Sequence, residues 1–189
     1  MGNYEKEKVR EMAKELGLEV HNKPDSQEIC FVKDNDYANY VKRHANQDIK
    51  EGNFVDTKGN ILGRHKGIVF YTIGQRIGLG IAFGKPMFVL DINPETNEVI
   101  LGSNDDLFSN ELIAKDVNLI TVDEITEPIR VEAKIRYSAR PAAATVYNNG
   151  KDSIRIVFDE PQRAITKGQS VVMYQGDKVV GGGIIDKSL

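Results

Sequence analysis

The strongest constraint on the fold is a dense series of short alternating segments in the last part of the chain. The stretch 130–138 alternates most clearly between apolar and charged residues. Its apolar face would hold Val131, Ala133, Ile135 and Tyr137, and its charged face Arg130, Glu132, Lys134 and Arg136. Such a pattern predicts a half-buried strand with the Tyr137 ring directed inward and the Arg136 side chain outward.

Turn residues divide the same region into hairpins. Asn148-Asn149-Gly150 separates the strand-like stretches 141–147 and 153–158, and Gly176-Asp177 separates 170–174 from 178–185. Asn-Gly and Gly-Asp pairs favour tight hairpin turns. Six short strands in roughly 80 residues predict a small β-barrel rather than a sandwich.

Helical spacing is confined to the beginning of the chain. Apolar residues at positions 9, 12, 13 and 16 predict a helix over 5–16, with Gly17 as its C-terminal cap. The run 29–32 predicts a short buried strand. A second helix begins after Asp34 or Asn35 and carries Tyr37, Tyr40, Val41 and His44 on one face.

The middle of the chain changes to strands and turns. Residues 53–56 and 61–62 form an expected hairpin around Lys58-Gly59-Asn60, and the β-branched and aromatic stretch 67–73 predicts a further strand. Strands over 86–92 and 98–101 flank an NPETN turn, and Asn104-Asp105-Asp106 marks a domain boundary. The fold class is therefore mainly β, with two short N-terminal helices, a small mixed central domain and a six-stranded β-barrel.

Charge is unevenly distributed, although the net charge is only −3. The stretches 57–90 and 133–151 contain Lys and Arg but no Asp or Glu, which allows locally positive surfaces. Solvated faces of ordinary strands are the alternative explanation. The sequence has no apolar run long enough to span a membrane and begins with charged residues, and its one cysteine fits a reducing cytoplasmic setting.

Few residues suggest chemistry by themselves. Cys30 is the one strongly nucleophilic side chain, although a lone cysteine in an apolar run is commonly a small core residue. The glycine-rich stretch 74–80 lacks the Gly-Lys-Ser/Thr ending of a phosphate-binding loop and the spacing of a dinucleotide-binding loop. The three histidines are scattered, so no metal site is expected. Residues that could hold phosphates and bases lie in the barrel region: Arg136, Tyr137, Arg140, Arg163 and Lys167.

Four segments together carry a specific resemblance. They are KPDSQEICFV at 23–32, GRHKGIVFYTIGQRIGLGI at 63–81, KIRYSARPAA at 134–143 and FDEPQRAITKGQSVVMYQGDKVVGGGII at 158–185. In this order and spacing the chain resembles the bacterial tRNA-specific 2-thiouridylases over essentially its whole length. The resemblance implies a partial chain, with residues 1–24 as the tail of a nucleotide-binding domain, 25–106 as the central domain and 107–189 as a translation-factor-like β-barrel that binds tRNA.

The resemblance also implies a reaction. In this family ATP adenylates O2 of the wobble uridine in tRNAs for Lys, Glu and Gln, and sulfur from an upstream persulfide carrier protein then replaces that oxygen. The persulfide-carrying cysteine of the family matches Cys30 here. The ATP-binding SGG-x-DS loop and the family's other cysteine have no counterpart in this sequence, so this chain alone is expected to be inactive.

The family's tRNA contacts match three barrel residues, Arg136, Tyr137 and Gln169. Two positions depart from the family pattern. Ser138 stands where a basic residue often follows the RY pair, and Lys167 stands where a proline precedes GQS. An RNA-binding module with a structural cysteine is the alternative to an enzyme part. A methyltransferase lacks support, because no glycine loop of the S-adenosylmethionine-binding type is present.

Overall fold

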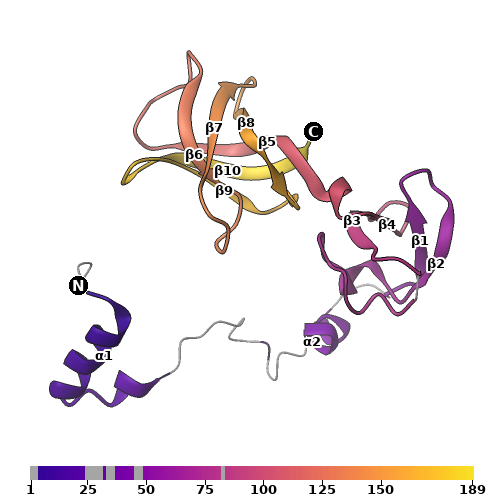
Figure 1. Cartoon of the computed structure of the whole chain (residues 1–189), viewed down its shortest axis with the longest axis horizontal. Coiled ribbons are helices and arrows are strands. Elements are labelled where there is room, and N and C mark those ends of the chain that lie inside the picture. Colours follow the sequence, from indigo (N-terminus) through magenta and orange to yellow (C-terminus); the bar gives the residue numbers. More distant parts are fainter. Residues whose placement is uncertain (1–3, 24–31, 33–36, 45–48, 82–83) are drawn as a thin grey trace. The chain divides into compact units, whose positions relative to one another are not determined.

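The computed structural model describes residues 4–23, 32, 37–44, 49–81 and 84–189 (Figure 1). The chain forms two compact units, residues 1–46 and 47–189. Cys30, the strand expected over 29–32 apart from Val32, and the helix caps expected at Asp34 or Asn35 lie outside the described residues.

The first unit is helical where it is described. Helix α1 spans Lys6–Glu15, a 3-10 turn η1 spans Glu19–Asn22, and helix α2 spans Tyr37–His44. The helix predicted over 5–16 is confirmed. Gly17 ends it with a φ of +69°, and the Leu18 N–H donates to the Ala13 carbonyl oxygen over 2.9 Å. No α1 side chain is buried, so its apolar stripe covers no core among the described residues.

The second unit begins with a small mixed sheet. Its strands are β1 Gly52–Asp56, β2 Ile61–His65, β3 Phe88–Asn93 and β4 Glu98–Gly102, in the order β2-β1-β4-β3. The predicted hairpins β1–β2 and β3–β4 are confirmed as antiparallel pairs, and β1 pairs with β4 in parallel. The buried core of this domain contains Phe54, Tyr71, Leu79, Met87, Val89, Val99 and Leu101.

The strand predicted over 67–73 is wrong. Ile68–Phe70 instead forms a 3-10 turn, η3; Tyr71 is buried in the core, and Ile68 and Phe70 are partly buried and pack against it. Gly67, with a φ of +129°, bends the chain out of the extended conformation, and its carbonyl oxygen accepts the Phe70 N–H over 3.2 Å. A local turn therefore overrides the β propensity of this stretch.

The predicted six-stranded β-barrel is confirmed. Its strands are β5 Phe108–Leu119, β6 Ile129–Lys134, β7 Ala142–Asn148, β8 Ser153–Arg163, β9 Ser170–Gln175 and β10 Lys178–Ser188. They close in the order β10-β5-β8-β7-β6-β9, and every neighbouring pair is antiparallel. Alternate residues of each strand fill the interior, among them Leu112, Val146, Ile156 and Met173.

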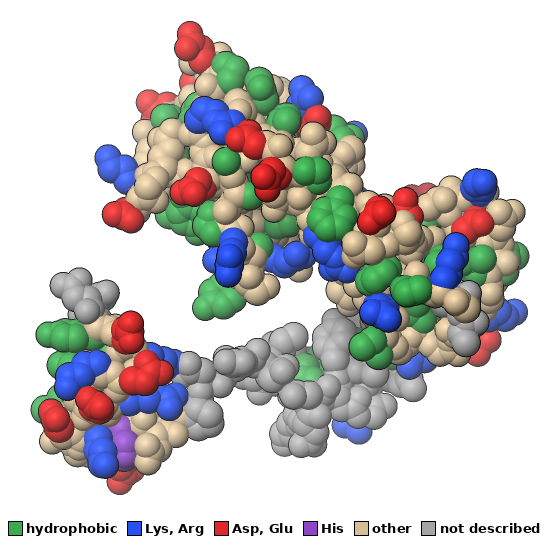
Figure 2. Space-filling view, viewed as in Figure 1, with side chains coloured by type: hydrophobic (Ala, Val, Ile, Leu, Met, Phe, Trp, Pro, Cys, Tyr) green, Lys and Arg blue, Asp and Glu red, His purple; other side chains and the backbone are tan. Residues whose placement is uncertain are grey.

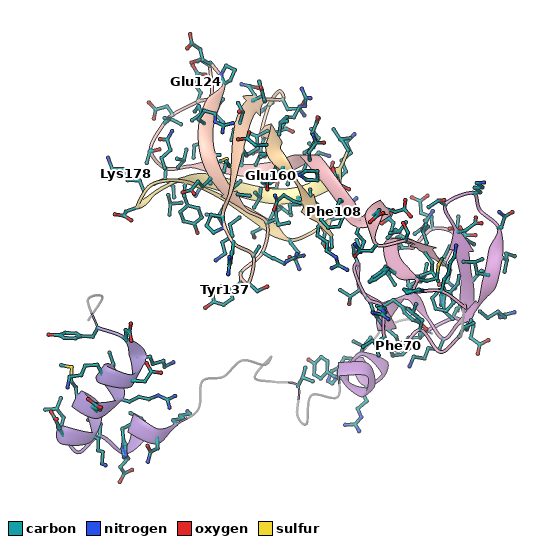
Figure 3. All side chains as sticks on the ribbon, viewed as in Figure 1. Phe70, Phe108, Glu124, Tyr137, Glu160 and Lys178 are labelled. Carbon is teal, nitrogen blue, oxygen red and sulfur yellow. The ribbon has the colours of Figure 1, made fainter. Side chains whose placement is uncertain are left out.

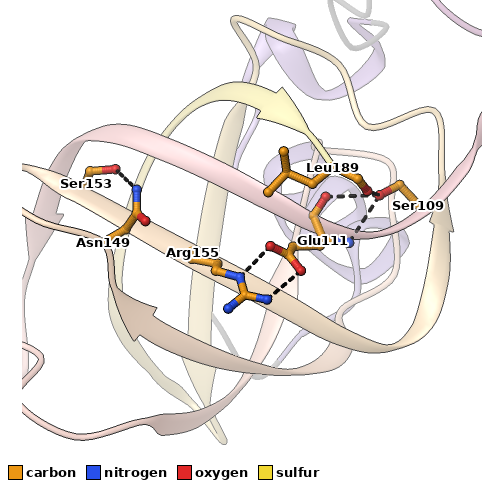
Figure 4. Close-up of polar contacts among 6 residues, drawn as sticks. All are labelled: Ser109, Glu111, Asn149, Ser153, Arg155 and Leu189. Carbon is orange, nitrogen blue, oxygen red and sulfur yellow. Dashed lines mark hydrogen bonds and ion pairs between the residues drawn. The ribbon is translucent and has the colours of Figure 1, made fainter.

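Charged and polar pairs tie strands together on the barrel exterior (Figure 4). Arg155 of β8 forms a two-point ion pair with Glu111 of β5, with Nη2 2.7 Å from Oε2. The amide of Asn149 donates to the Ser153 hydroxyl over 3.0 Å, within the predicted β7–β8 hairpin. These contacts support a register that the buried faces already specify.

A short apolar junction connects the sheet domain to the barrel. The 3-10 turn η4, Asp105–Leu107, leads from β4 into β5, and a buried cluster joins Phe88, Leu107 and Ala164. The Ala164 N–H donates to the Leu107 carbonyl oxygen over 2.8 Å. The domain boundaries expected at residues 24 and 106 stay predictions.

Candidate nucleic-acid interface

Tyr137 is the most exposed large hydrophobic side chain of the barrel, with 97% of its surface accessible. It projects from the turn that follows β6 (Figure 3). The Lys134 Nζ atom lies 5.5 Å from the centre of its ring. The prediction that Tyr137 points inward is wrong, because β6 ends at Lys134 and the Ala139 N–H closes a turn on the Arg136 carbonyl oxygen over 3.1 Å. An exposed ring beside an ammonium group can stack on a base and hold its phosphate.

Arg136 is half-buried, which contradicts the prediction that it faces outward. Its guanidinium donates to the carbonyl oxygens of Ala164 over 3.2 Å and of Arg163 over 3.1 Å. The side chain therefore fixes the backbone at the end of β8, in the segment that leads to the β9 strand. In this arrangement Arg136 acts as a positioning residue for the surface beside it.

Gln169 lies in the turn between β8 and β9, and its side chain is exposed. The backbone of this turn is anchored on β10: the Gly168 N–H donates to the Ile185 carbonyl oxygen, and the Ile185 N–H donates to the Gln169 carbonyl oxygen, each over 2.8 Å. Gly168 has a φ of +84°, a conformation that favours glycine. A fixed backbone with a free amide can present a donor and an acceptor to a polar partner.

Lys167 extends the positive character of this turn. Its side chain is 75% exposed, and its Nζ atom lies 3.8 Å from the Asp186 carboxylate, which is also bound by Lys115 at 2.9 Å. The hydrogen bond from Lys115 lowers the pKa of Asp186, and the charge of Lys167 contributes further. Figure 2 shows Lys and Arg side chains gathered at the end of the barrel where Figure 3 labels Tyr137.

The basic group expected in the barrel is not one patch. Arg140 is exposed, but Arg163 belongs to the junction with the sheet domain. Its Nε atom donates to the Asn104 side-chain oxygen over 3.2 Å, and its guanidinium lies 5.5 Å from the centre of the Phe88 ring. Arg163 therefore holds the two domains of this unit together and is not a free phosphate-binding group.

The sequence prediction overlooked Lys134 as a partner of Tyr137. The prediction extended the strand to residue 138, whereas β6 ends at Lys134. Ser138 favours turns, and Pro141 restricts Arg140 to an extended conformation, so a turn before residue 141 was foreseeable.

The remaining predictions on chemistry concern Cys30, which lies outside the described residues. Among the residues that the structure describes, no group of three His, Cys, Asp or Glu side chains could hold a metal ion. The same residues include no helix that is long and apolar enough to cross a membrane.

Two backbone amides of the glycine-rich stretch are hydrogen-bonded within the fold. The Gly74 N–H donates to the Val89 carbonyl oxygen over 2.8 Å, and the Gln75 N–H donates to the Thr72 carbonyl oxygen over 3.0 Å. These amides are used within the fold, whereas a phosphate-binding loop directs successive amides at its ligand. The amides of Gly74 and Gln75 are therefore not free to bind a phosphate.

Comparison with known proteins assigns the parts of the chain. Residues 109–185 match an aminomethyltransferase β-barrel domain, residues 38–103 a tRNA methyl transferase PRC-barrel domain, and residues 1–34 a tRNA methyl transferase HUP domain. Together with the closed barrel, these matches give the chain the domain order of proteins whose family models are described as tRNA methyl transferase domains.

Curated relatives are similar over almost the whole chain. The chain is 72% identical to the tRNA-specific 2-thiouridylase MnmA of Clostridioides difficile, over 100% of the chain and 52% of that protein. It is 61% identical to tRNA-specific 2-thiouridylase MnmA 1 of Clostridium botulinum strain Loch Maree, over 98% of the chain and 52% of that protein. The chain belongs to the tRNA-specific 2-thiouridylase family, as the sequence resemblance predicted, and spans about half the length of these relatives.

Proposed function

We propose that this chain is the sulfur-carrying and tRNA-binding part of an enzyme that makes 2-thiouridine in tRNA. The observation that carries the proposal is the 72% identity to a tRNA-specific 2-thiouridylase across all 189 residues. The wobble uridine of tRNAs for Lys, Glu and Gln is the proposed substrate, in the cytoplasm. Activation of O2 with ATP takes place on a part of the enzyme that this chain does not supply.

Cys30 is the proposed sulfur carrier. Its thiolate attacks the terminal sulfur of a persulfide on an upstream carrier protein, whose own thiolate leaves, so that Cys30 gains the persulfide. The terminal sulfur then attacks C2 of the activated uridine, and AMP leaves with the former O2. A second cysteine, outside this chain, attacks the Cys30 sulfur; a disulfide forms and the sulfur remains on C2.

The barrel supplies the proposed tRNA contacts. The Tyr137 ring, 97% exposed, stacks on an unpaired base or sugar, and Lys134 beside it meets the phosphate. The exposed Gln169 amide contacts a polar group of the RNA from the neighbouring turn. Arg136 contributes indirectly, because its two hydrogen bonds hold the backbone at residues 163 and 164.

The test is 2-thiouridine formation on unmodified tRNA. This chain is fused behind a nucleotide-binding domain from the same family and supplied with ATP and a persulfide donor. A Cys30→Ser fusion serves as the matched variant, because it replaces one sulfur atom by oxygen. We expect thiolation by the first fusion only, with equal tRNA binding by both.

The other outcomes are informative. Thiolation by both fusions would make Cys30 structural and contradict the sulfur-carrier role. Equal tRNA binding without thiolation by either would favour an RNA-binding module. The unfused chain is expected neither to bind ATP nor to form 2-thiouridine.

A further inference from the structure

A second positive site lies in the sheet domain. A cavity of about 360 Å³ opens beside the glycine-rich stretch. Two cations, Arg76 and Lys85, line it, and no acidic side chain is among the described residues that line it. Its apolar wall is made by Leu79 and Met87, which are 6% and 8% exposed. The wall is therefore part of the core of this domain, whereas the charged groups stand at the surface.

The loop that carries Arg76 is held in place by its own hydrogen bonds. The Gln75 side chain accepts the Thr72 N–H over 3.0 Å and donates to the Ile77 carbonyl oxygen over 2.9 Å. The Val89 N–H donates to the Gln75 carbonyl oxygen over 2.9 Å, which ties the loop to β3. The position of the Arg76 backbone is thus fixed before any ligand arrives, which reduces the entropy lost on binding.

The charges of this site are only weakly compensated. No ion pair within 4.0 Å involves Arg76 or Lys85 among the described residues. Lys85 acts on Asp106 at longer range, but that carboxylate already accepts two hydrogen bonds from Ser103, each of 2.7 Å. The whole stretch 57–90 lacks Asp and Glu, so no residue of this segment places a negative charge near the site.

Ile77 follows Arg76 in the chain and lies outside the residues that line the cavity. Its side chain is 85% exposed, directly after Arg76 in the same loop. An exposed aliphatic group next to a cation suits a ligand with alternating apolar and negative parts, such as the sugars and phosphates of an RNA strand. A free inorganic anion would make no use of it.

We propose that Arg76 and Lys85 bind phosphates of the tRNA backbone, with Ile77 packed against an adjoining sugar or base. This inference rests on the proposed function, because it assumes that tRNA is the partner. It adds a contact in the sheet domain, separate from Tyr137 and Gln169 in the barrel. Phosphate contacts position an RNA without reading its sequence, so this site fixes the orientation of the bound tRNA.

The test is the salt dependence of tRNA binding by the full chain. The Arg76→Gln/Lys85→Gln variant is compared with Lys58→Gln/Lys178→Gln, which removes the same charge from two exposed positions away from the cavity. We expect the first variant to bind roughly tenfold more weakly and to lower the slope of log K against log salt by about two. The control pair should lower it by less than about one unit. An Arg76→Lys/Lys85→Arg variant should bind like the wild type, and thermal melting confirms that each variant is folded.

The outcomes separate the two proposals. Equal changes in both double variants, or no change in either, would overturn the phosphate site while leaving the proposed function intact. Failure of the wild-type chain to bind tRNA would overturn both. Inorganic phosphate or AMP is also titrated, and binding is followed by the NMR signals of the backbone amides of Gly78, Gly80 and Gly84. If phosphate or AMP binds tightly and tRNA does not displace it, the site binds a free anion, and this result would contradict the assignment to RNA.

Discussion

The Nε2 atom of His65 lies 3.1 Å from the carbonyl oxygen of Asn97, and this contact joins β2 to the turn between β3 and β4. On the other side of the ring, Nδ1 accepts the Gly67 N–H over 3.0 Å. The ring is 3% exposed and lies edge-on to Phe54 and Tyr71, with centres 5.4 and 5.5 Å apart. A neutral imidazole with its proton on Nε2 satisfies both partners, whereas a protonated ring would turn a second N–H toward the Gly67 amide.

We therefore predict that the sheet domain loses stability in mild acid. Burial lowers the pKa of His65 below its ordinary value of 6.5. Below pH 6.5 the His65 imidazole binds a proton in the unfolded chain but not in the folded chain. The free energy of unfolding therefore falls as the pH decreases from 6.5 toward the lowered pKa of the folded state. Chemical denaturation at several pH values measures this. A His65→Gln variant should be less stable than the wild type at neutral pH. Its free energy of unfolding should change less with pH above about pH 5, where carboxylates remain ionised. An equally steep profile in that variant would assign the effect to another group.

Replacement of Arg136 by Ala should mainly reduce the stability of the fold. The change leaves the carbonyl oxygens of Arg163 and Ala164 without their donor, at a cost of about 1–3 kcal/mol. The measurement is the denaturant midpoint, followed by the salt slope of tRNA binding under conditions where the variant is folded. Because the guanidinium is occupied by backbone, the slope should stay unchanged. A slope lowered by about one unit without any loss of stability would show that Arg136 binds a phosphate directly.

Tyr137→Ala should weaken tRNA binding and leave the stability of the protein unchanged, the opposite of Arg136→Ala. The ring is 97% exposed, so the free energy of unfolding should change by less than about 0.5 kcal/mol. Loss of stacking should weaken tRNA binding by about 1–3 kcal/mol, and Tyr137→Phe should retain most of the affinity. Fluorescence anisotropy with labelled tRNA measures both. Wild-type affinity in the Ala variant would remove Tyr137 from the interface.

Gly74 and Gly80 provide a matched test of the junction between sheet and barrel. Their φ angles are similar, +86° and +79°, so any other residue is strained at either position. A Cβ atom at Gly74 would lie 3.2 Å from the Ala164 Cβ, whereas at Gly80 it would meet no atom within 4 Å. Gly74→Val should therefore be less stable than Gly80→Val by about 1–3 kcal/mol. Equal thermal midpoints would mean that the junction is loose enough to accept the extra atoms.

Much of the architecture was predictable from the sequence because its signals are local. Alternation over 130–134 and the turns at 148–150 and 176–177 specify hairpins whose residues are neighbours in the chain. The parallel pairing of β1 with β4 was not predicted. It joins residues more than forty positions apart, such as Phe54 and Val99, and no local pattern encodes it.

The candidate interface shows the same division. Resemblance placed Arg136, Tyr137 and Gln169 near tRNA, but the alternation rule assigned the first two side chains to the wrong sides. The rule holds only while a strand has partners. Strand β6 pairs with β9 as far as Lys134 opposite Val172, and with β7 as far as Ala133 opposite Ala142. Beyond that point the chain turns, and the Tyr137 ring is released to solvent.

The sequence by itself therefore determined the hairpins, the six-stranded barrel and the family, because each depends on residues close together or on motifs in a set order. The tertiary structure alone decided where β6 ends, that Arg136 holds the backbone of residues 163 and 164, and that His65 is buried against Phe54 and Tyr71. Those outcomes depend on which distant segments supply hydrogen-bond partners and apolar neighbours, and only the folded chain brings such segments together.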